Sequence, residues 1–462
     1  MSPLHIWSRT YSMNRISDLP SRKPTSSLSI LPLSTITRSF FVTTVSSSPL
    51  LLSPALAMLS FLAESKSALL DPDQNALLKQ LLTKTLYAQF CAGETPDAVR
   101  RTIHELKNLG YSGIILGYAK EAVMDENEVN AAGAENIDEK RNAREILAWK
   151  DGTMKTVNMA TNGDFVALKF SGAGRQALQH LVQGLSPSPE LETAIVEICE
   201  TARQRGARLL FDAEQQAIQK AIDVWVLRFQ RRYNASFGLR GEKSALVYGT
   251  YQAYLHSTPA TLSQHLAAAN NEGFTLGVKL VRGAYLGSDP RHIIHQTKED
   301  TDTAYDNIAE SLIMRKYGSL LTPPSSSSLL GSLNEHAFPQ VNLVLATHNW
   351  ASIRKARSLR DQQTRCGKPL IEMAYGQLQG MADDVSCQLV RESNDVKTSD
   401  HRDAESPKTY KYLVWGTVGE CTKYILRRGH ENRDAVLRTE NTRRAMFAEL
   451  KRRWAQNHWS DS

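Results

Sequence analysis

The chain of 462 residues is long enough to bury a substantial core, as one large barrel or as two or three ordinary domains. Hydrophobic residues make up 41% and charged residues 22%, an ordinary balance for a globular protein. The net charge of +7 is concentrated in residues 1–60, which hold five Arg and Lys residues against one acid, Asp18. The remainder is close to neutral, so the composition argues against a nucleic-acid-binding surface.

Residues 1–60 have the composition of a mitochondrial transit peptide, being rich in Ser and Thr, bearing arginines and nearly free of acids. A disordered leader is the alternative interpretation. The apolar stretch 49–63 falls short of the roughly 20 residues that span a bilayer, and Pro54 interrupts it. It is therefore expected to be the end of the presequence or a segment that docks on a surface.

Cysteine usage indicates a reducing compartment such as the mitochondrial matrix. The five cysteines are scattered along the chain, without a Cys-x-x-Cys pair. Neither a disulfide scaffold nor a zinc site is expected, and we predict no metal.

Residues 64–106 are predicted to form an N-terminal helical segment, since Leu78, Leu81, Leu82 and Leu86 recur at helical spacing. After this segment, eight short apolar runs of strand length alternate with longer helix-like stretches. The runs cover residues 112–118, 165–170, 208–212, 245–250, 275–282, 342–347, 370–373 and 410–414.

This alternation predicts a (β/α)8 TIM-like barrel over residues 107–455, because the buried strands of a parallel barrel are continuous apolar runs. A doubly wound open sheet is the alternative, but no Gly-x-Gly-x-x-Gly motif follows an early strand. Polar or low-complexity composition predicts surface insertions near residues 125–140, 322–332 and 392–408.

Polar residues follow the predicted strands, at the barrel end where TIM-barrel enzymes carry their reactive groups. Each residue alone is usually a cap or a turn former, but Lys169 and Arg282 are costly to bury without an anionic partner. The set comprises Lys169, Asp212, Gln252, Arg282, Thr347, His348, Asn349, Gln377 and Tyr412.

A helix after the last strand carries Arg427, Arg428 and Glu431. Two guanidinium groups can bind a carboxylate through parallel hydrogen bonds. Glu431 lies four residues after Arg427 and three after Arg428, within reach of both on a helix. A solvated charged face is the alternative. Together with Lys169 and Arg282, the pair suggests a ligand that bears both carboxylate and phosphate.

Six motifs in order resemble the proline dehydrogenase (proline oxidase) family, in its mitochondrial, fungal-like form. The resemblance runs from Ala92 to Asn432. The motifs are Phe-Asp-Ala-Glu, Tyr-Gln-Ala-Tyr, Lys-Leu-Val-Arg-Gly-Ala-Tyr, Ala-Thr-His-Asn, Gln-Leu-x-Gly-Met and Arg-Arg-x-x-Glu-Asn. Two departures from the family pattern are Gly117, where relatives often carry an acid, and Val414, where proline is common.

The resemblance implies non-covalent FAD across the strand ends. It implies Arg282 beside the reactive flavin nitrogen N5, Gln252 at the flavin edge and Gln377 near the adenine. Thr347, His348 and Asn349 are implied to line the cofactor, Glu431 to reach a cofactor hydroxyl, and Thr297 and Lys298 to contact the pyrophosphate.

For the substrate, the resemblance implies that Lys169, Arg427 and Arg428 bind the carboxylate of L-proline. Asp212 is implied to support this basic cluster, Tyr285 and Tyr412 to pack against the pyrrolidine ring, and Glu121 to pair with an arginine and close the site. The implied catalytic residues are Arg282, Lys169 and Asp212.

The implied reaction is hydride transfer from L-proline to FAD, giving Δ1-pyrroline-5-carboxylate. Electrons would pass to a quinone, with peripheral association on the matrix side of the inner mitochondrial membrane. No general base stands out, so solvent is expected to take the amine proton.

The sequence leaves three alternatives open. The first is hydroxyproline dehydrogenase on the same fold, against which Tyr412 argues because its phenol crowds the ring. The second is a Schiff-base aldolase that uses Lys279 or Lys169 as nucleophile. The third is a non-enzymatic barrel that binds an amino acid.

Overall fold

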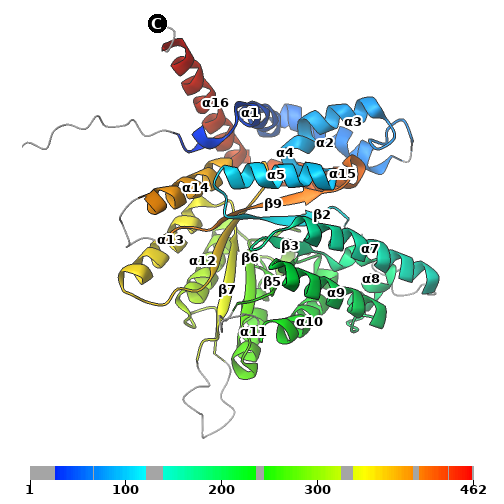
Figure 1. Ribbon diagram of the computed structural model, residues 1–462, viewed down its shortest axis with the longest axis vertical. Coiled ribbons are helices and arrows are strands. Elements are labelled where there is room, and N and C mark those ends of the chain that lie inside the picture. The colour runs from blue at the N-terminus through cyan, green and yellow to red at the C-terminus, as the bar shows by residue number, and fades with distance from the viewer. Residues whose placement is uncertain are drawn as a thin grey trace, which may run out of the picture.

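A closed barrel of eight parallel strands forms the centre of the molecule, with helices around it (Figure 1). The computed structural model describes residues 26–65, 67–120, 139–235, 244–323, 337–398, 405–434 and 436–459. The barrel strands are β2 (Gly113–Tyr118), β3 (Phe165–Leu168), β4 (Arg208–Phe211), β5 (Val247–Gln252), β6 (Leu276–Val281), β7 (Val341–Ala346), β8 (Met373–Leu378) and β9 (Thr409–Trp415). They pair in chain order, and β9 closes the ring against β2. The predicted TIM-like barrel is therefore confirmed.

One strand lies outside the predicted set. Cys91–Gly93 forms β1 within the segment that was expected to be helical, and Cys91 pairs with Val414 of β9. The last pair between β8 and β9 joins Leu378 to Tyr412, so β1 takes over this side of β9 where β8 ends.

The seventh predicted strand was misplaced. The sequence predicted this strand at residues 370–373, whereas β8 begins at Met373 and continues to Leu378. Gly376 and Gln377 lowered the apolar signal, yet both are buried because β8 is covered on both faces.

The helices around the barrel begin at recognisable caps. Thr95 accepts a hydrogen bond from the Ala98 amide, and Thr297 forms a capping box with Asp300. These helices are α5 (Pro96–Asn108), α7 (Glu139–Met159), α8 (Arg175–Val182), α9 (Pro189–Arg205), α10 (Gln216–Tyr233), α11 (Thr258–Glu272), α12 (Lys298–Met314), α13 (Trp350–Arg365), α14 (Asp383–Thr398), α15 (Val418–Asp434) and α16 (Val436–Trp459). Short helical turns are η3 (Phe170–Ala173) and η4 (Arg291–Ile293).

An N-terminal layer of helices covers one side of the barrel (Figure 1). It comprises η1 (Ser27–Ile30), α1 (Leu33–Ser47), α2 (Pro49–Glu64), α3 (Ala76–Leu82), η2 (Thr83–Tyr87) and α4 (Ala88–Phe90). Val42 and Leu59 lie in one hydrophobic cluster with Val418 and Ile425 of α15. Residues 26–60, which were assigned to a leader, are thus helical and packed rather than disordered.

The predicted insertions fall largely on residues that the structure does not describe. Residues 121–138 and 324–336 lie outside the described ranges, while residues 139–140 begin α7. The stretch 392–408 was expected to be a loop, but its first part, to Thr398, is the end of α14. Ser393 is buried on that helix, so the buried face of α14 extends into a segment that looked polar overall.

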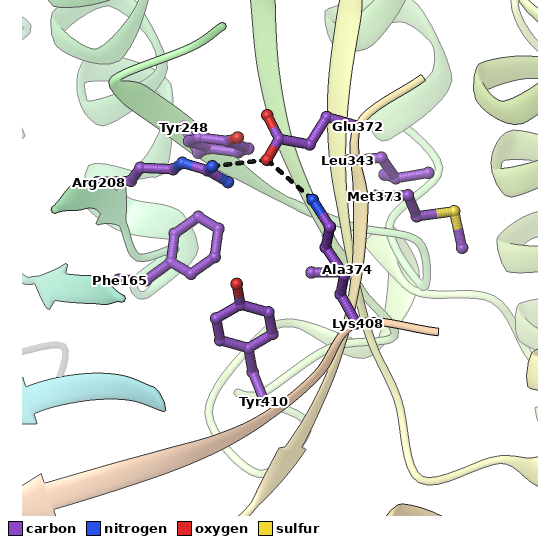
Figure 2. Close-up of a pocket in the computed structure, with 9 residues that line it drawn as sticks. All are labelled: Phe165, Arg208, Tyr248, Leu343, Glu372, Met373, Ala374, Lys408 and Tyr410. Atoms are coloured by element: carbon purple, nitrogen blue, oxygen red, sulfur yellow. Dashed lines mark hydrogen bonds and ion pairs between the residues drawn. The ribbon is translucent and has the colours of Figure 1, made fainter. Parts of the chain in front are cut away.

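Aromatic and charged side chains close the amino-terminal end of the barrel (Figure 2). Arg208 donates a hydrogen bond to Glu372 at 2.5 Å and lies over the ring of Phe165. Tyr248 and Tyr410 pack edge-on against the same ring, at centroid distances of 5.3 and 5.2 Å. The pocket that they line is at the end opposite the predicted reactive groups, where barrel residues serve stability.

Candidate active site

Asp212 joins two strands that are not its neighbours. Its Oδ1 accepts a hydrogen bond from Lys279 Nζ at 2.5 Å, and its Oδ2 accepts one from the Tyr412 hydroxyl at 2.7 Å. The Lys279 ammonium also lies 5.1 Å from the centre of the Tyr412 ring. Asp212 and Lys279 are both buried, so the ion pair is largely shielded from water.

The same geometry bears on the Schiff-base alternative. Lys279 Nζ is engaged by the Asp212 carboxylate and lies over the Tyr412 ring, so it is not presented as an open nucleophile. Lys279 is therefore a structural cation at the end of the barrel, and the sequence had considered it only as a nucleophile.

A second cluster surrounds Arg282, immediately after β6. Its Nε donates to Asp302 Oδ1 at 2.8 Å, its Nη2 donates to Ser352 Oγ at 2.7 Å, and its Nη1 donates to the Thr347 hydroxyl. The guanidinium carbon lies 4.3 Å from the centre of the Tyr305 ring. The anionic partner that the sequence expected from a ligand is thus supplied by Asp302.

Asp302 is a site residue that the sequence reasoning missed. Burial alone would raise the pKa of its carboxyl, but hydrogen bonds from Lys298 and Arg282 outweigh burial and hold this pKa below its ordinary value. The sequence feature that could have identified Asp302 is its spacing, because it follows Lys298 by one helical turn on α12. Thr297, the N-cap of α12, is exposed, as is the Lys298 side chain.

Thr347, His348 and Asn349 follow β7 and fix the local backbone. Asn349 caps α13 by accepting from the Ala351 amide at 2.9 Å, and its amide nitrogen reaches Asp302 at 3.3 Å. His348 Nε2 accepts from the Leu378 amide at 3.1 Å. These bonds tie the ends of β7 and β8 to the Arg282 cluster.

Two buried carboxamides leave hydrogen-bonding atoms unused. Gln252 Oε1 accepts from the Ala284 amide at 2.9 Å, but its Nε2 has no partner among the described residues. Gln377 Nε2 donates to the Thr347 carbonyl at 3.2 Å, and its Oε1 likewise has none. Buried polar atoms are normally paired, so one donor and one acceptor here fit a polar ligand.

The two arginines of α15 contact aromatic rings. The Arg427 guanidinium carbon lies 5.6 Å from the centre of the Tyr285 ring, and that of Arg428 lies 4.9 Å from the centre of the Tyr424 ring. Arg428 is buried, whereas Arg427 is partly exposed. The contact between Arg427 and Tyr285 brings α15 against the segment that follows β6, as the predicted substrate site requires.

Lys169 directly follows β3 and is held through its backbone. Its carbonyl accepts from the Trp149 indole at 2.9 Å, and it precedes η3. Glu214, a buried residue that the sequence quoted without a role, accepts from the Phe170 and Ser171 amides at 2.8 and 3.1 Å. It therefore fixes the turn that carries Lys169.

Two predicted site residues lie beyond what the structure describes. Glu121 falls outside the described residues. Glu431 belongs to α15, but its side chain lies outside the description, so its proposed contacts with the arginines or a cofactor stay predictions.

Curated relatives share most of the chain. "Probable proline dehydrogenase, mitochondrial" of Schizosaccharomyces pombe is 27% identical over 414 residues, which cover 80% of this chain and 79% of that protein. "Hydroxyproline dehydrogenase" of Bos taurus is 27% identical over 423 residues, 81% of this chain and 82% of that protein.

A solved structure supports the fold. Proline utilization A from Bdellovibrio bacteriovorus, inactivated by N-propargylglycine, superposes with a TM-score of 0.56 at 14% identity, over 89% of this chain. This chain spans 40% of that longer chain, and the likeness concerns the fold alone.

Residues 99–441 match the family model described as "Proline dehydrogenase". Because this match covers most of the chain, the chain belongs to the proline dehydrogenase family of oxidoreductases.

Proposed function

We propose that this protein oxidises L-proline to Δ1-pyrroline-5-carboxylate with FAD as cofactor and passes the electrons to a membrane quinone. The observation that carries the proposal is the contact of Arg427 with Tyr285, which brings the basic helix α15 against the strand-end segment. The family match and the names of the relatives support the substrate class.

The cofactor site is supported by the chemistry of its donors and acceptors. The unused Gln252 Nε2 and Gln377 Oε1 would hold polar edges of FAD, and Thr347, His348 and Asn349 would line it. Thr297 and Lys298, at the amino-terminal end of α12, suit a pyrophosphate because a helix N-terminus attracts anions. FAD, when bound, supplies a hydride acceptor.

The proposed catalytic cation is Arg282. Its guanidinium is braced by Asp302, Thr347 and Ser352, so its charge is held in one place, where it would stabilise the anionic form of a reduced flavin. Such bracing removes the cost of reorganising a mobile side chain during the reaction.

Proline is held by its carboxylate in this proposal. Lys169, Arg427 and Arg428 orient the acid group, while Tyr285 and Tyr412 face the ring and exclude water. Asp212 fixes Tyr412 through its hydroxyl. Glu121 would close the site, and the amine proton would pass to solvent.

A second candidate substrate is hydroxyproline, because four relatives named hydroxyproline dehydrogenase are 25–29% identical over most of the chain. We favour proline because the Tyr412 hydroxyl is engaged with Asp212 and its ring cannot swing aside without breaking that bond.

We also propose a location on the matrix side of the inner mitochondrial membrane; the names of several relatives support the mitochondrial part of this proposal. Removing all 60 residues of the predicted leader would take Val42 and Leu59 from the core shared with α15. Arg453 further donates to the carbonyls of Leu28 and Leu31. We therefore propose that any presequence is cut upstream of Leu28.

Anaerobic mixing of the purified protein with L-proline tests the proposal. The flavin absorbance should bleach in a single turnover, and trans-4-hydroxy-L-proline should bleach it more slowly. A colourless protein that takes up no FAD would contradict the cofactor assignment, and faster bleaching by hydroxyproline would reverse the choice of substrate.

A further inference from the structure

Exposed apolar side chains gather on the N-terminal layer and on α16. Among the described residues, the exposed large hydrophobics of α1 and α2 include Phe41, Leu50, Met58 and Phe61, and α16 adds Phe447 and Trp454. On the barrel helices, the exposed large hydrophobics that the structure describes are isolated ones such as Leu147 and Val224. Figure 1 shows α1, α2 and α16 on the same side of the barrel. Exposed large apolar side chains that gather on neighbouring helices are typical of an interaction surface.

Helix α2 is apolar on both faces. Leu52, Leu56 and Leu59 are buried, whereas Leu50, Met58 and Phe61 on the other face are 88%, 59% and 62% exposed. No charged residue occurs between positions 49 and 63. Because a helix that is apolar all round is normally covered on every side, the outward face of α2 lacks its partner in the isolated chain.

The inward face of α2 is already committed to the helix that carries the site arginines. A Cβ at Gly429 of α15 would lie 2.5 Å from Leu56 Cδ2, which shows how closely the two helices approach. Insertion of α2 across a bilayer would therefore uncover α15. Only the outward face is available for a partner.

The dimensions also favour a surface contact over a membrane span. Among the described helices, none alone has the length and hydropathy to cross a membrane. The pair Leu33–Ser47 and Leu50–Ala63 meets both requirements together, but it bends by 98°. A bent apolar pair lying in the plane of an interface buries one face and keeps its other face on the protein.

Helix α16 carries a net positive charge, which is complementary to an anionic surface. It packs beside α1, with the rings of Phe40 and Phe447 stacked at 5.7 Å. Between Glu440 and Trp454 it carries five basic residues against two acids, Glu440, which pairs with Arg444, and Glu449, which pairs with Arg452 and Arg453. Arg444 and Lys451 are exposed, and so is Trp454, a residue type that favours the headgroup region.

We propose that the outward face of α2, together with Phe41, Phe447 and Trp454, is the docking face by which this protein binds an anionic bilayer surface. Its apolar side chains enter between the headgroups, and Arg444 and Lys451 contact the anionic lipids. The choice of a bilayer over another partner rests on the proposed transfer of electrons to a membrane quinone. The bilayer is bound on the side of α15 that faces away from the barrel.

Flotation of the purified full chain with vesicles tests the docking face. Met58→Glu/Phe61→Glu should weaken binding to vesicles of phosphatidylcholine with cardiolipin by roughly a hundredfold, since two inserted apolar side chains become charged. Leu147→Glu/Val224→Glu, on equally exposed residues of the barrel helices, is the matched control and should bind as the unmodified protein does. Met58→Ser/Phe61→Ser provides a milder change if the charged variant folds poorly.

Two further measurements separate the possible outcomes. Arg444→Glu/Lys451→Glu should weaken binding to cardiolipin vesicles but not to pure phosphatidylcholine. Proline oxidation with a soluble dye should be unchanged in the α2 variants, whereas reduction of a quinone in vesicles should fall. Equal flotation of the α2 variants and the unmodified protein overturns the proposal. So does a dimer in lipid-free solution that Met58→Glu/Phe61→Glu dissociates while the unmodified protein does not float. Flotation without flavin bleaching by proline would instead contradict the proposed function alone.

Discussion

Tyr412 of β9 donates a hydrogen bond to Asp212, which follows β4, with 2.7 Å between the phenol oxygen and Oδ2. The other oxygen of the same carboxylate accepts from Lys279 of β6 at 2.5 Å. One buried acid thus positions an aromatic ring and neutralises a cation, and each of the three groups comes from a different part of the barrel.

Replacing Asp212 with alanine should lower the free energy of unfolding by about 3–5 kcal/mol, because it leaves the Lys279 ammonium buried without its counter-charge. Urea denaturation provides the measurement. Asp212→Ala/Lys279→Met removes both charges and should recover much of the loss. A double variant as unstable as the sum of the single variants would show that the two residues do not interact.

Tyr412 should control discrimination between ring substituents. Tyr412→Ser opens space beside the substrate and should raise kcat/KM for trans-4-hydroxy-L-proline relative to L-proline by roughly tenfold or more. Tyr412→Phe keeps the ring but releases it from Asp212, so the ratio should change in the same direction but by less than in Tyr412→Ser. Steady-state kinetics with both substrates decides this, and an unchanged ratio in Tyr412→Ser would remove the residue from the substrate site.

Arg428→Ala should raise KM for L-proline while leaving FAD bound. The loss of a charged hydrogen bond to the carboxylate costs about 1.5–3 kcal/mol, roughly a ten- to hundredfold fall in kcat/KM. Flavin content is read from the visible spectrum. Arg444→Ala on α16 is the control, since Arg444 is exposed and pairs with Glu440 of its own helix. Unaltered proline kinetics in Arg428→Ala would show that Arg428 does not bind the carboxylate of L-proline.

Leu59→Ala should destabilise the fold even though residue 59 belongs to the predicted leader. Leu59 is buried against α15, so the cavity and lost transfer energy should cost about 2–5 kcal/mol. Leu50→Ala, on the exposed face of the same helix, should stay within about 0.5 kcal/mol. If both variants unfold at the same urea concentration as the unmodified protein, the packing of α2 on α15 does not contribute to stability.

Stability should fall as the pH drops from about 6.5 to about 4, in part because of His265. Burial lowers the pKa of this histidine to about 4, and its ring lies 2.7 Å from the Tyr251 hydroxyl. The unfolded chain gains a proton near pH 6.5 and the folded chain only near pH 4, so stability is complete above the higher value and is lost on acidification. His265→Phe should flatten the pH dependence of urea denaturation, while the same change at exposed His104 is the control.

The local pattern of the chain was sufficient for the barrel and for the residues at its strand ends. Continuous apolar runs followed by polar residues placed Asp212, Gln252 and Thr347 correctly, because burial on both faces of a parallel strand leaves a mark in the sequence. It misplaced β8 and missed β1, since three-residue strands and strands with Gly and Gln lack that mark.

The partners of the charged groups were decided only by the tertiary structure. Arg282 was expected to need a bound anion, yet Asp302, on the next helix, neutralises it. Lys279 and Tyr412 lie 67 and 200 residues from Asp212, and no local spacing predicts which of them share a carboxylate. Likewise, composition predicted a leader for residues 1–60, while burial of Val42 and Leu59 depends on α15, which comes hundreds of residues later. Composition and periodicity are properties of neighbouring residues, whereas ion pairing and burial depend on contacts that form only when the barrel closes.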